Sequence, residues 1–241
     1  MKNSYYFISD IHFGLLSKEK EVEREMVFVE FLYSIRDTAK ELYILGDLFD
    51  YWFEYKKVIQ KGYFRTFTAL NDLVLNGTKV HYIIGNHDFM HRDFFEKEIG
   101  VTLYQSEIIL QIDNKKFYLA HGDGLVKNDF GYLILKKIFR SKIAQNMYSI
   151  IHPNLGIKIA EGTSKTSRDY TGNKEYGEED GLYEFAKTKF ELGYSYVILG
   201  HTHKKRLEEI NGKFYANLGT WLSKPMYGIY ENAKFDIKDW K

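Results

Sequence analysis

The 241-residue sequence contains no cysteine and only two prolines. Without cysteine the chain can form no disulfide framework, thiolate zinc site, iron–sulfur cluster or cysteine nucleophile. It also has no apolar run near the roughly 20 residues that a membrane-spanning helix needs. The first apolar run, Tyr5–Ile8, is short and ends just before Asp10, which is unlike a signal peptide. These absences predict a cytoplasmic protein.

An excess of charge of one sign is missing as well. The 34 Lys and Arg residues are balanced by 33 Asp and Glu residues, so the formal net charge is +1. No whole-molecule field would attract nucleic acid, and we expect no nucleic-acid partner. With 44% hydrophobic and 28% charged residues, the composition is that of a globular chain. Its length suits one large domain or two small ones, and we predict a single domain over residues 1–241. Nothing in the composition predicts an oligomeric state.

Short apolar runs rich in Val, Ile, Tyr and Phe recur along the chain and predict buried strands. Helical periodicity separates the early runs over Glu19–Arg36 and Phe64–Leu75, and this alternation predicts an α/β fold. The second half is richer in strands, with hairpin turns expected at Asn114-Lys115 and Asn211-Gly212. The predicted strands are Tyr5–Ser9, Leu42–Leu45, Val80–Ile84, Ile108–Ile112, Phe117–Ala120, Tyr196–Leu199, Phe214–Leu218 and Met226–Tyr230.

One stretch, residues 130–168, has helical periodicity and no predicted strand. Its recurring apolar residues, at steps of four, are Leu135, Phe139, Ile143, Met147 and Ile151. Residues 131–168 contain seven Lys or Arg residues and a single acid, Glu161. Such a basic amphipathic stretch fits a helix packed on the core through its apolar face. It also fits an inserted cap that meets an anionic, lipid-like ligand or a membrane surface.

Five polar clusters follow predicted strands. They are Asp10-Ile11-His12, Gly46-Asp47-Leu48-Phe49-Asp50, Gly85-Asn86-His87-Asp88, His121-Gly122-Asp123 and Gly200-His201-Thr202-His203. Ligands of open α/β sheets lie beyond the carboxyl ends of the strands, so these clusters should face one site. Five of the eight histidines belong to them, whereas His81, His91 and His152 are expected to be ordinary structural residues.

The side chains of these clusters are carboxylates, imidazoles and one asparagine amide, a set that suits divalent ions such as Mn, Fe or Zn. Asp10 and His12 point to the same side of an extended segment because side chains alternate along it, and His201 and His203 do the same. If Asp47 bridges two ions about 3.5–4 Å apart, the ions can bind a phosphate, generate hydroxide and neutralise charge. We expect two divalent ions, manganese first and iron or zinc as alternatives. The other interpretations are one stabilising ion, or turns capped by Asp and Asn.

In order, Asp-x-His, Gly-Asp-x-x-Asp, Gly-Asn-His-Asp, His-Gly-Asp and Gly-His-Thr-His resemble the motifs of the calcineurin-like metallophosphoesterase superfamily over nearly the whole chain. The resemblance implies a four-layer α-β-β-α sandwich of two mixed sheets. It assigns one metal ion to Asp10, His12, Asp47 and His203. It assigns the other ion to Asp47, Asn86, His121 and His201.

A narrower resemblance is to UDP-2,3-diacylglucosamine hydrolase of lipid A synthesis. It rests on Leu42–Trp52 and on His121–Leu125 followed by Asp129, Gly131 and Tyr132. That family cleaves a pyrophosphate bond to give UMP and 2,3-diacylglucosamine 1-phosphate, and it inserts a helical cap after the His-Gly-Asp block. Residues 130–168 stand at that place, so the resemblance implies an inserted cap. The cap's apolar face would shelter acyl chains, and its cations would meet phosphates or transiently the inner face of the cell membrane.

The best-known members of that family have arginine after the motif asparagine, where this chain has His87. The wider superfamily has histidine there, commonly interpreted as the acid that protonates the leaving oxygen. Two enzyme hypotheses follow: a divergent branch of the lipid A enzyme, or a metallophosphoesterase for a soluble nucleotide or phosphoprotein. A third hypothesis, from a different class, is an inactive scaffold that only binds a partner.

We predict that Asn86 and His87 hold phosphoryl oxygens together with the metal ions. Asp50 and Asp88 are expected to orient histidine ligands. Asp123 is a further candidate for that role, or a plain turn former. The residues expected to contact substrate are Asn86, His87, Asp129, Tyr132, Ser164, Lys165, Ser167, Arg168 and His201. For the four residues between 164 and 168, a solvated helix end is the alternative.

Overall fold

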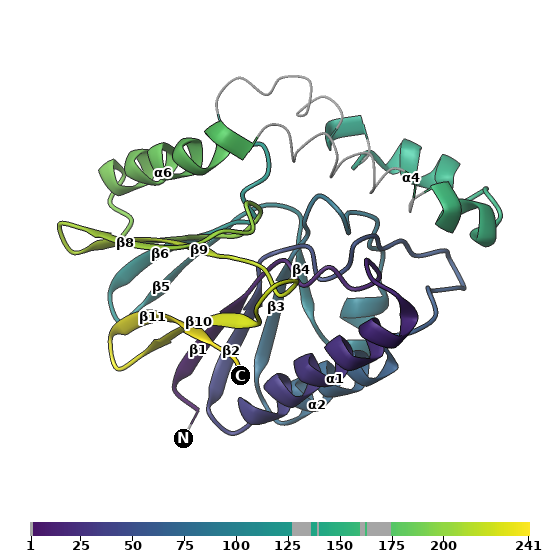
Figure 1. The fold of residues 1–241 in the computed structure, drawn as a ribbon, viewed down its shortest axis with the longest axis horizontal. Coiled ribbons are helices and arrows are strands. Elements are labelled where there is room, and N and C mark those ends of the chain that lie inside the picture. The colour runs from purple at the N-terminus through teal and green to yellow at the C-terminus, as the bar shows by residue number, and fades with distance from the viewer. Residues whose placement is uncertain (1, 127–135, 139, 160–161, 163–174) are drawn as a thin grey trace.

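The computed structural model describes residues 2–126, 136–138, 140–159, 162 and 175–241. A first sheet has six strands in the order β11-β10-β1-β2-β3-β4 (Figure 1). From β1 to β4 the neighbouring strands are parallel, whereas β10 and β11 are antiparallel. The strands are β1 (Ser4–Ile8), β2 (Ala39–Ile44), β3 (Lys79–Ile83), β4 (Thr102–Tyr104), β10 (Met226–Glu231) and β11 (Lys234–Asp239).

A second sheet has five strands in the order β5-β6-β7-β9-β8. It is also mixed. The pairs β6–β7 and β7–β9 are parallel, whereas the edge strands β5 and β8 are antiparallel to β6 and β9. The strands are β5 (Ile108–Ile112), β6 (Lys115–Leu119), β7 (Tyr196–Leu199), β8 (Lys205–Ile210) and β9 (Lys213–Leu218).

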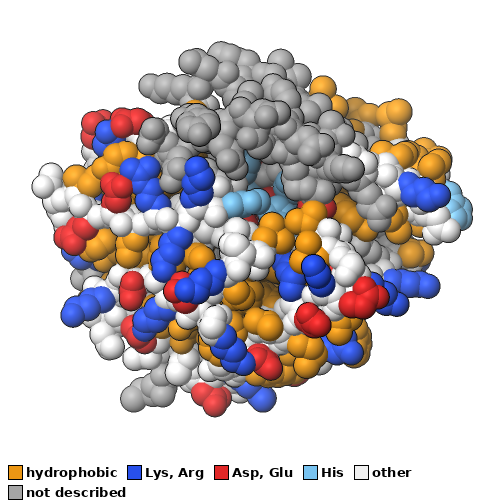
Figure 2. Space-filling model, viewed as in Figure 1, with side chains coloured by type: hydrophobic (Ala, Val, Ile, Leu, Met, Phe, Trp, Pro, Cys, Tyr) orange, Lys and Arg blue, Asp and Glu red, His pale blue; other side chains and the backbone are white. Residues whose placement is uncertain are grey.

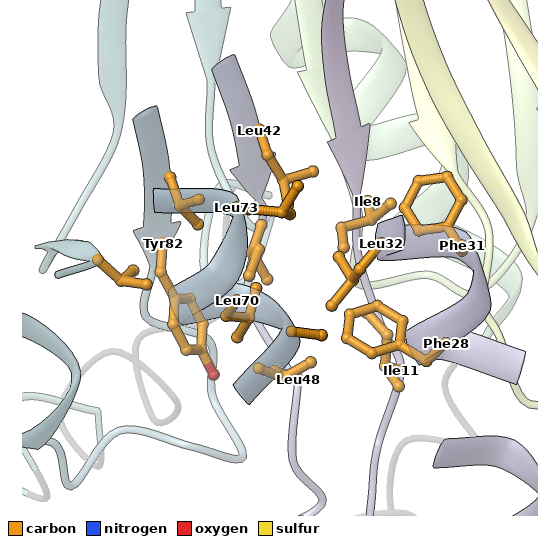
Figure 3. Close-up of a cluster of buried hydrophobic side chains, with 14 of the residues drawn as sticks. Ile8, Ile11, Phe28, Phe31, Leu32, Leu42, Leu48, Leu70, Leu73 and Tyr82 are labelled. Carbon is orange, nitrogen blue, oxygen red and sulfur yellow. The ribbon is translucent and has the colours of Figure 1, made fainter. Parts of the chain in front are cut away.

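Three buried clusters hold these sheets and the helices in four layers. One cluster packs the first sheet against α1 (Lys18–Ser34), α2 (Phe64–Leu75) and the short helix η1 (Phe95–Ile99), as Figure 3 shows in part. A second cluster lies between the sheets, and a third packs the second sheet against α6 (Glu175–Glu191) (Figure 1). The expected α/β sandwich with α-β-β-α layers and two mixed sheets is confirmed.

The parallel strands become apolar and buried toward their carboxyl ends, as in Leu42–Ile44 of β2 and Phe117–Leu119 of β6, because both faces are covered there. In β2, Leu42 and Ile44 contact the helices while Tyr43 points between the sheets, where it stacks on Phe7 at a ring-centroid distance of 5.3 Å. This alternation follows from the period of two along a strand. Because neighbouring parallel strands also run in the same direction, the polar residues that follow them lie at the same edge of the molecule.

One of the two predicted hairpin turns is wrong by one residue. Asn211 and Gly212 have φ values of 52° and 74°, as the predicted turn requires. In the other hairpin the left-handed residues are Asp113 and Asn114, at 48° and 60°, and Lys115 already belongs to β6. Asp and Asn tolerate this conformation better than Lys because their short polar side chains can bond locally.

The insert, as we call residues 130–168, contains helix at 136–138, in α4 (Lys142–Tyr148) and at 153–159, with turns at 140–141 and 149–152 among its described residues. Ser141 caps α4, since its Oγ accepts a hydrogen bond of 3.2 Å from the Ala144 amide. Of the predicted apolar series, Leu135 and Phe139 lie outside the described residues, and Ile143 and Met147 are exposed. No helix in the described part of the chain has the length and apolar character to cross a membrane.

Candidate metal centre

The side chains predicted to bind metal meet where the two sheets end. Asp10 and His12 follow β1, Asp47 follows β2, Asn86 follows β3, His121 follows β6, and His201 and His203 follow β7. In three groups of side chains, one potential ligand atom from each residue lies within 4.8 Å of those of the other two. The groups are Asp10, His12 and His203; His12, Asp47 and His87; and Asp10, Asp47 and His121. Figure 2 shows histidine side chains at the centre of this face.

Five of these residues have a left-handed backbone. Asp10, His12 and Asp47 have φ values of 54°, 52° and 52°, and His201 and His203 have values of 75° and 60°. Residues other than glycine adopt this region at a cost of order 1–3 kcal/mol each, and they do so mainly at functional sites. Two glycines allow the loops to approach so closely, because a Cβ at Gly85 or Gly200 would collide with Asp47 or with Ser9. The fold therefore maintains an unfavourable backbone to bring these side chains together.

Asp10, His12 and His203 form one half of the centre. His203 Nε2 lies 3.3 Å from Asp10 Oδ1 and 3.0 Å from His12 Nε2. The other oxygen, Asp10 Oδ2, accepts a 2.9 Å hydrogen bond from the His201 amide. Asp10 Oδ1 is buried and accepts no hydrogen bond within the described structure. A buried carboxylate oxygen in this state leaves a coordination position open for a cation.

His121, Asn86 and His201 form the other half. His121 Nε2 lies 2.9 Å from Asn86 Oδ1 and 3.2 Å from Asp47 Oδ2. His201 Nδ1 lies 3.1 Å from the same Asn86 oxygen. Asp47 Oδ2 is also 3.7 Å from His12 Nε2, so this one carboxylate oxygen faces both halves. That position fits a bridging ligand between two ions.

The electrostatics of the site favour cations. Burial raises the pKa of Asp10, but hydrogen bonds with His12 and His203 outweigh it and lower this pKa well below its ordinary value, so Asp10 is charged. Burial lowers the pKa of His12, yet Asp10 and Asp50 outweigh it and raise this pKa to about 9. In the same way Asp47 outweighs burial and raises the pKa of His121 to about 10. The carboxylates thus hold protons on the imidazoles at positions where a divalent ion would replace them. Oxygen and imidazole donors without thiolate suit such an ion.

Asp50 lies beside two of the histidines. Its Oδ1 is 3.7 Å from His12 Nδ1 and 3.7 Å from His87 Nδ1, and its carbonyl is 3.1 Å from His87 Nδ1. These contacts fit the orienting role predicted for Asp50, because a ring fixed through one nitrogen presents the other in a set direction.

Asp88 has other partners than the predicted histidine. Its carboxylate accepts hydrogen bonds from the amides of Leu48 and Gly85, at 2.8 and 2.9 Å, and from the Tyr82 hydroxyl. Asp88 therefore holds the backbone of the two loops that carry Asp47 and Asn86. The position of Asp88 in the motif could not reveal the contact with Leu48, since that amide comes from another strand's loop.

Asp123 lies in the turn after His121, as one of its two predicted roles requires, and it also has partners that were not predicted. It forms an ion pair of 2.6 Å with Lys136 of the insert. Burial raises the pKa of Asp123, but His121 and Lys136 outweigh it and lower this pKa to about 2. Sequence reasoning missed Lys136, and it missed Arg24 and Arg140, which contact the ligand loops through backbone carbonyls. A single basic residue in a helix carries no local signal for such a contact.

The remaining predicted residues divide into two groups. Asn86, His87 and His201 lie in the centre, where the His87 amide donates a 2.9 Å hydrogen bond to Asp47 Oδ1. The candidates Asp129, Tyr132, Ser164, Lys165, Ser167 and Arg168 lie outside the described residues. His81 and His91 lie apart from the centre, beside Glu41 and Glu54.

Comparison with known proteins places this geometry in a family. The calcineurin-like phosphoesterase family model matches residues 4–205. The UDP-2,3-diacylglucosamine hydrolase of Porphyromonas gingivalis strain W83 is 27% identical, over 97% of this chain and 96% of the relative. That of Haemophilus influenzae strain PittGG is 31% identical, over 92% of this chain and 91% of the relative. A solved archaeal phosphodiesterase is 14% identical, with a TM-score of 0.48 over 98% of this chain and 99% of that one.

The family resemblance seen in the sequence motifs is thereby confirmed. Members of this family use divalent metal ions, and the clustered carboxylates and imidazoles described above can hold them. The chain belongs to the calcineurin-like phosphoesterase family and is a hydrolase of that metal-dependent class.

Proposed function

We propose that this chain cleaves the pyrophosphate bond of UDP-2,3-diacylglucosamine to give UMP and 2,3-diacylglucosamine 1-phosphate, a step of lipid A biosynthesis. The observation that carries the proposal is the similarity of nearly the whole chain to UDP-2,3-diacylglucosamine hydrolases, at 27% and 31% identity. The narrow motif match around Asp47 and His121 agrees with it.

Two divalent ions would be held by seven side chains. The ligands of one would be Asp10, His12, Asp47 and His203, and those of the other would be Asp47, Asn86, His121 and His201. Manganese is the ion we propose first, and iron or zinc would fit the same donors. Ions held there polarise phosphoryl oxygens, neutralise developing charge and supply a nucleophile from water at neutral pH.

The chain's own residues would do the rest by positioning. Asn86 is the only amide in the cluster and can also donate from its nitrogen to a phosphoryl oxygen. His87 would face the phosphate with one ring nitrogen while the other is fixed by Asp50. Burial and the neighbouring His12 lower the pKa of His87, so the free protein favours its neutral form. A doubly charged pyrophosphate beside the ring would raise that pKa and let His87 donate a proton to the leaving oxygen.

The insert supplies apolar surface next to this centre. Gln145 of α4 donates a 3.4 Å hydrogen bond to the Phe89 carbonyl, close to Asn86 and His87 in sequence. The described part of the insert has these exposed apolar side chains: Ile138, Ile143, Met147, Ile150, Leu155 and Ile159. Residues 136–159 contain five Lys or Arg residues and no acid. We propose that this surface meets acyl chains and, transiently, the anionic inner face of the cell membrane, which places the enzyme in the cytoplasm.

The deciding experiment is to incubate the purified full chain and Mn²⁺ with UDP-2,3-diacylglucosamine and to measure UMP. Asp47→Asn serves as the inactive control, and UDP-glucosamine as the substrate without acyl chains. Preferential release of UMP from the acylated substrate supports the proposal. Equal rates on both substrates overturn the lipid assignment in favour of a soluble nucleotide substrate. The presence of His87 where the lipid A enzymes have arginine supports that alternative. If no activated phosphodiester is cleaved either, the chain is a binding scaffold.

A further inference from the structure

Two cations of the insert reach back to the loop that carries His121. Lys136 Nζ lies 2.6 Å from Asp123 Oδ2 and also donates a 3.0 Å hydrogen bond to the Asp123 carbonyl. Arg140, one helical turn later, lies 3.9 Å from the same carboxylate oxygen. Asp123 is 4% exposed, so this ion pair is shielded from water on its acidic side. Shielded pairs with several hydrogen bonds hold geometry better than surface pairs do.

Arg140 also contacts a second ligand loop. Its guanidinium donates hydrogen bonds to the carbonyls of Ile84 and Gly85, at 3.0 and 2.9 Å, and to that of Gln105 at 2.6 Å. Gly85 directly precedes Asn86 and His87. One side chain of the insert therefore fixes the stretch of backbone from which the amide and the imidazole of the candidate site project.

The core contains a parallel arrangement. Arg24 of α1 donates to the carbonyls of Ile11 and His12, and it is held by Glu21 at 2.8 Å. Both arginines thus bind the carbonyls of a loop that carries metal-type ligands. They differ in origin, because Arg24 belongs to a core helix and Arg140 belongs to the insert.

We propose that Lys136 and Arg140, with Asp123, form a clamp that positions the Asn86–His87 loop and the His121 loop. Docking of the insert is then part of building the centre, in addition to any contact with substrate. Lys136 and Arg140 are positioning residues, since they act through the loops rather than on the reacting atoms. The inference rests on the metal centre of the proposed function but does not depend on the acylated substrate.

The test uses the full chain with Mn²⁺ and bis(p-nitrophenyl) phosphate, a small diester without acyl chains. Arg140→Met should lower kcat by about 10–100-fold with little change in KM, as loss of an outer partner of a metal site does. It should also weaken Mn²⁺ binding and speed hydrogen exchange of amides 85–88. Arg140→Lys keeps a charge near Asp123 but not the three carbonyl bonds, and should show an intermediate loss. Lys234→Met, at an exposed position of β11 outside the insert, is the control for loss of a cation and should change nothing.

The outcomes separate this inference from the proposed function. If Arg140→Met and Arg140→Lys leave kcat, Mn²⁺ affinity and amide exchange of 85–88 unchanged, or only lower Tm, the clamp is refuted. If the wild type releases no UMP from UDP-2,3-diacylglucosamine, the proposed function fails, while Mn²⁺ binding and amide exchange still test the clamp. A double-mutant cycle between Asp123→Asn and Lys136→Met adds a further test, because additive losses of Mn²⁺ affinity would contradict a shared clamp.

Discussion

The ligand loops of the core and the insert both depart from the usual rule that apolar side chains are buried and ionisable ones exposed, but they do so in opposite ways. In the loops, Asp10, Asp47 and His121 are buried although they are ionisable. In the insert, Ile143, Met147 and Ile150 are 75%, 66% and 85% exposed although they are apolar. Each reversal is costly for a folded monomer and points to a partner that offsets it: a cation for the loops, an apolar ligand or surface for the insert. Catalysis and substrate selection would then lie in different parts of the chain.

The division is tested most strongly at the carboxylate that faces both halves of the centre. Asp47→Asn should abolish nearly all turnover on every substrate, because each ion contributes several kcal/mol of charge stabilisation, or about 10³-fold in rate. Metal analysis should show both ions bound more weakly. Near-normal turnover with two bound ions would contradict the bridging assignment. A loss confined to acylated substrates would contradict the division between catalysis in the ligand loops and substrate selection in the insert.

His87 tests the division at a residue that should act on the leaving group. His87→Ala should lower kcat on a pyrophosphate substrate by ~10²–10⁴-fold, the range for loss of a general acid. The loss should be far smaller on bis(p-nitrophenyl) phosphate, whose leaving group needs no proton. Steady-state kinetics on both substrates measures the difference. Equal losses would assign His87 to positioning of the phosphoryl group instead.

The pH dependence of metal binding sharpens the account of the core. Because the pKa values of His12 and His121 are raised from 6.5 to about 9 and about 10, their protonated forms stabilise the metal-free fold. That stabilisation is complete below pH 6.5 and is lost as the pH rises through 9 to 10. A divalent ion must displace these protons, so its apparent affinity should rise about tenfold per pH unit for each proton displaced. Mn²⁺ should therefore raise Tm more at pH 8.5 than at pH 6.0; an equal or smaller rise at pH 8.5 would refute this.

Much of the fold was predictable because burial leaves a local signal. The parallel strands are apolar on both faces, so Leu42–Leu45 and Val80–Ile84 mark β2 and β3 to within a few residues. The polar clusters at their ends follow from the same rule, since the carboxyl ends of parallel strands meet at one edge. The resemblance to the calcineurin-like motifs then named seven side chains, and these lie together in the structure.

The remainder depends on contacts between distant segments. The amides bound by Asp88, the carbonyls bound by Arg24 and Arg140, and the ion pair of Asp123 with Lys136 join residues from different elements. Side-chain type alone cannot reveal a bond to a backbone group elsewhere. The misplaced turn at Asp113 has a different cause, because Asp and Asn accept a left-handed backbone more readily than Lys, and the prediction overlooked this local preference.

The smallest expected effect concerns the insert, and it separates the two parts of the molecule most sharply. Ile143→Glu should raise KM for UDP-2,3-diacylglucosamine by about five- to tenfold, since one or two methylenes lose burial at ~0.8 kcal/mol each. Hydrolysis of bis(p-nitrophenyl) phosphate should barely change, because the side chain is 75% exposed and this substrate has no acyl chain to meet it. The matched control is Leu75→Glu at the end of α2, which is equally exposed at 77% but lies in a core helix. Thermal melting checks that both variants are folded. If Ile143→Glu and Leu75→Glu treat the two substrates alike, the exposed apolar face of the insert does not select acyl chains. The buried ionisable residues of the loops would then still be explained by metal ions. The exposed apolar residues of the insert would belong to a surface that has no part in catalysis.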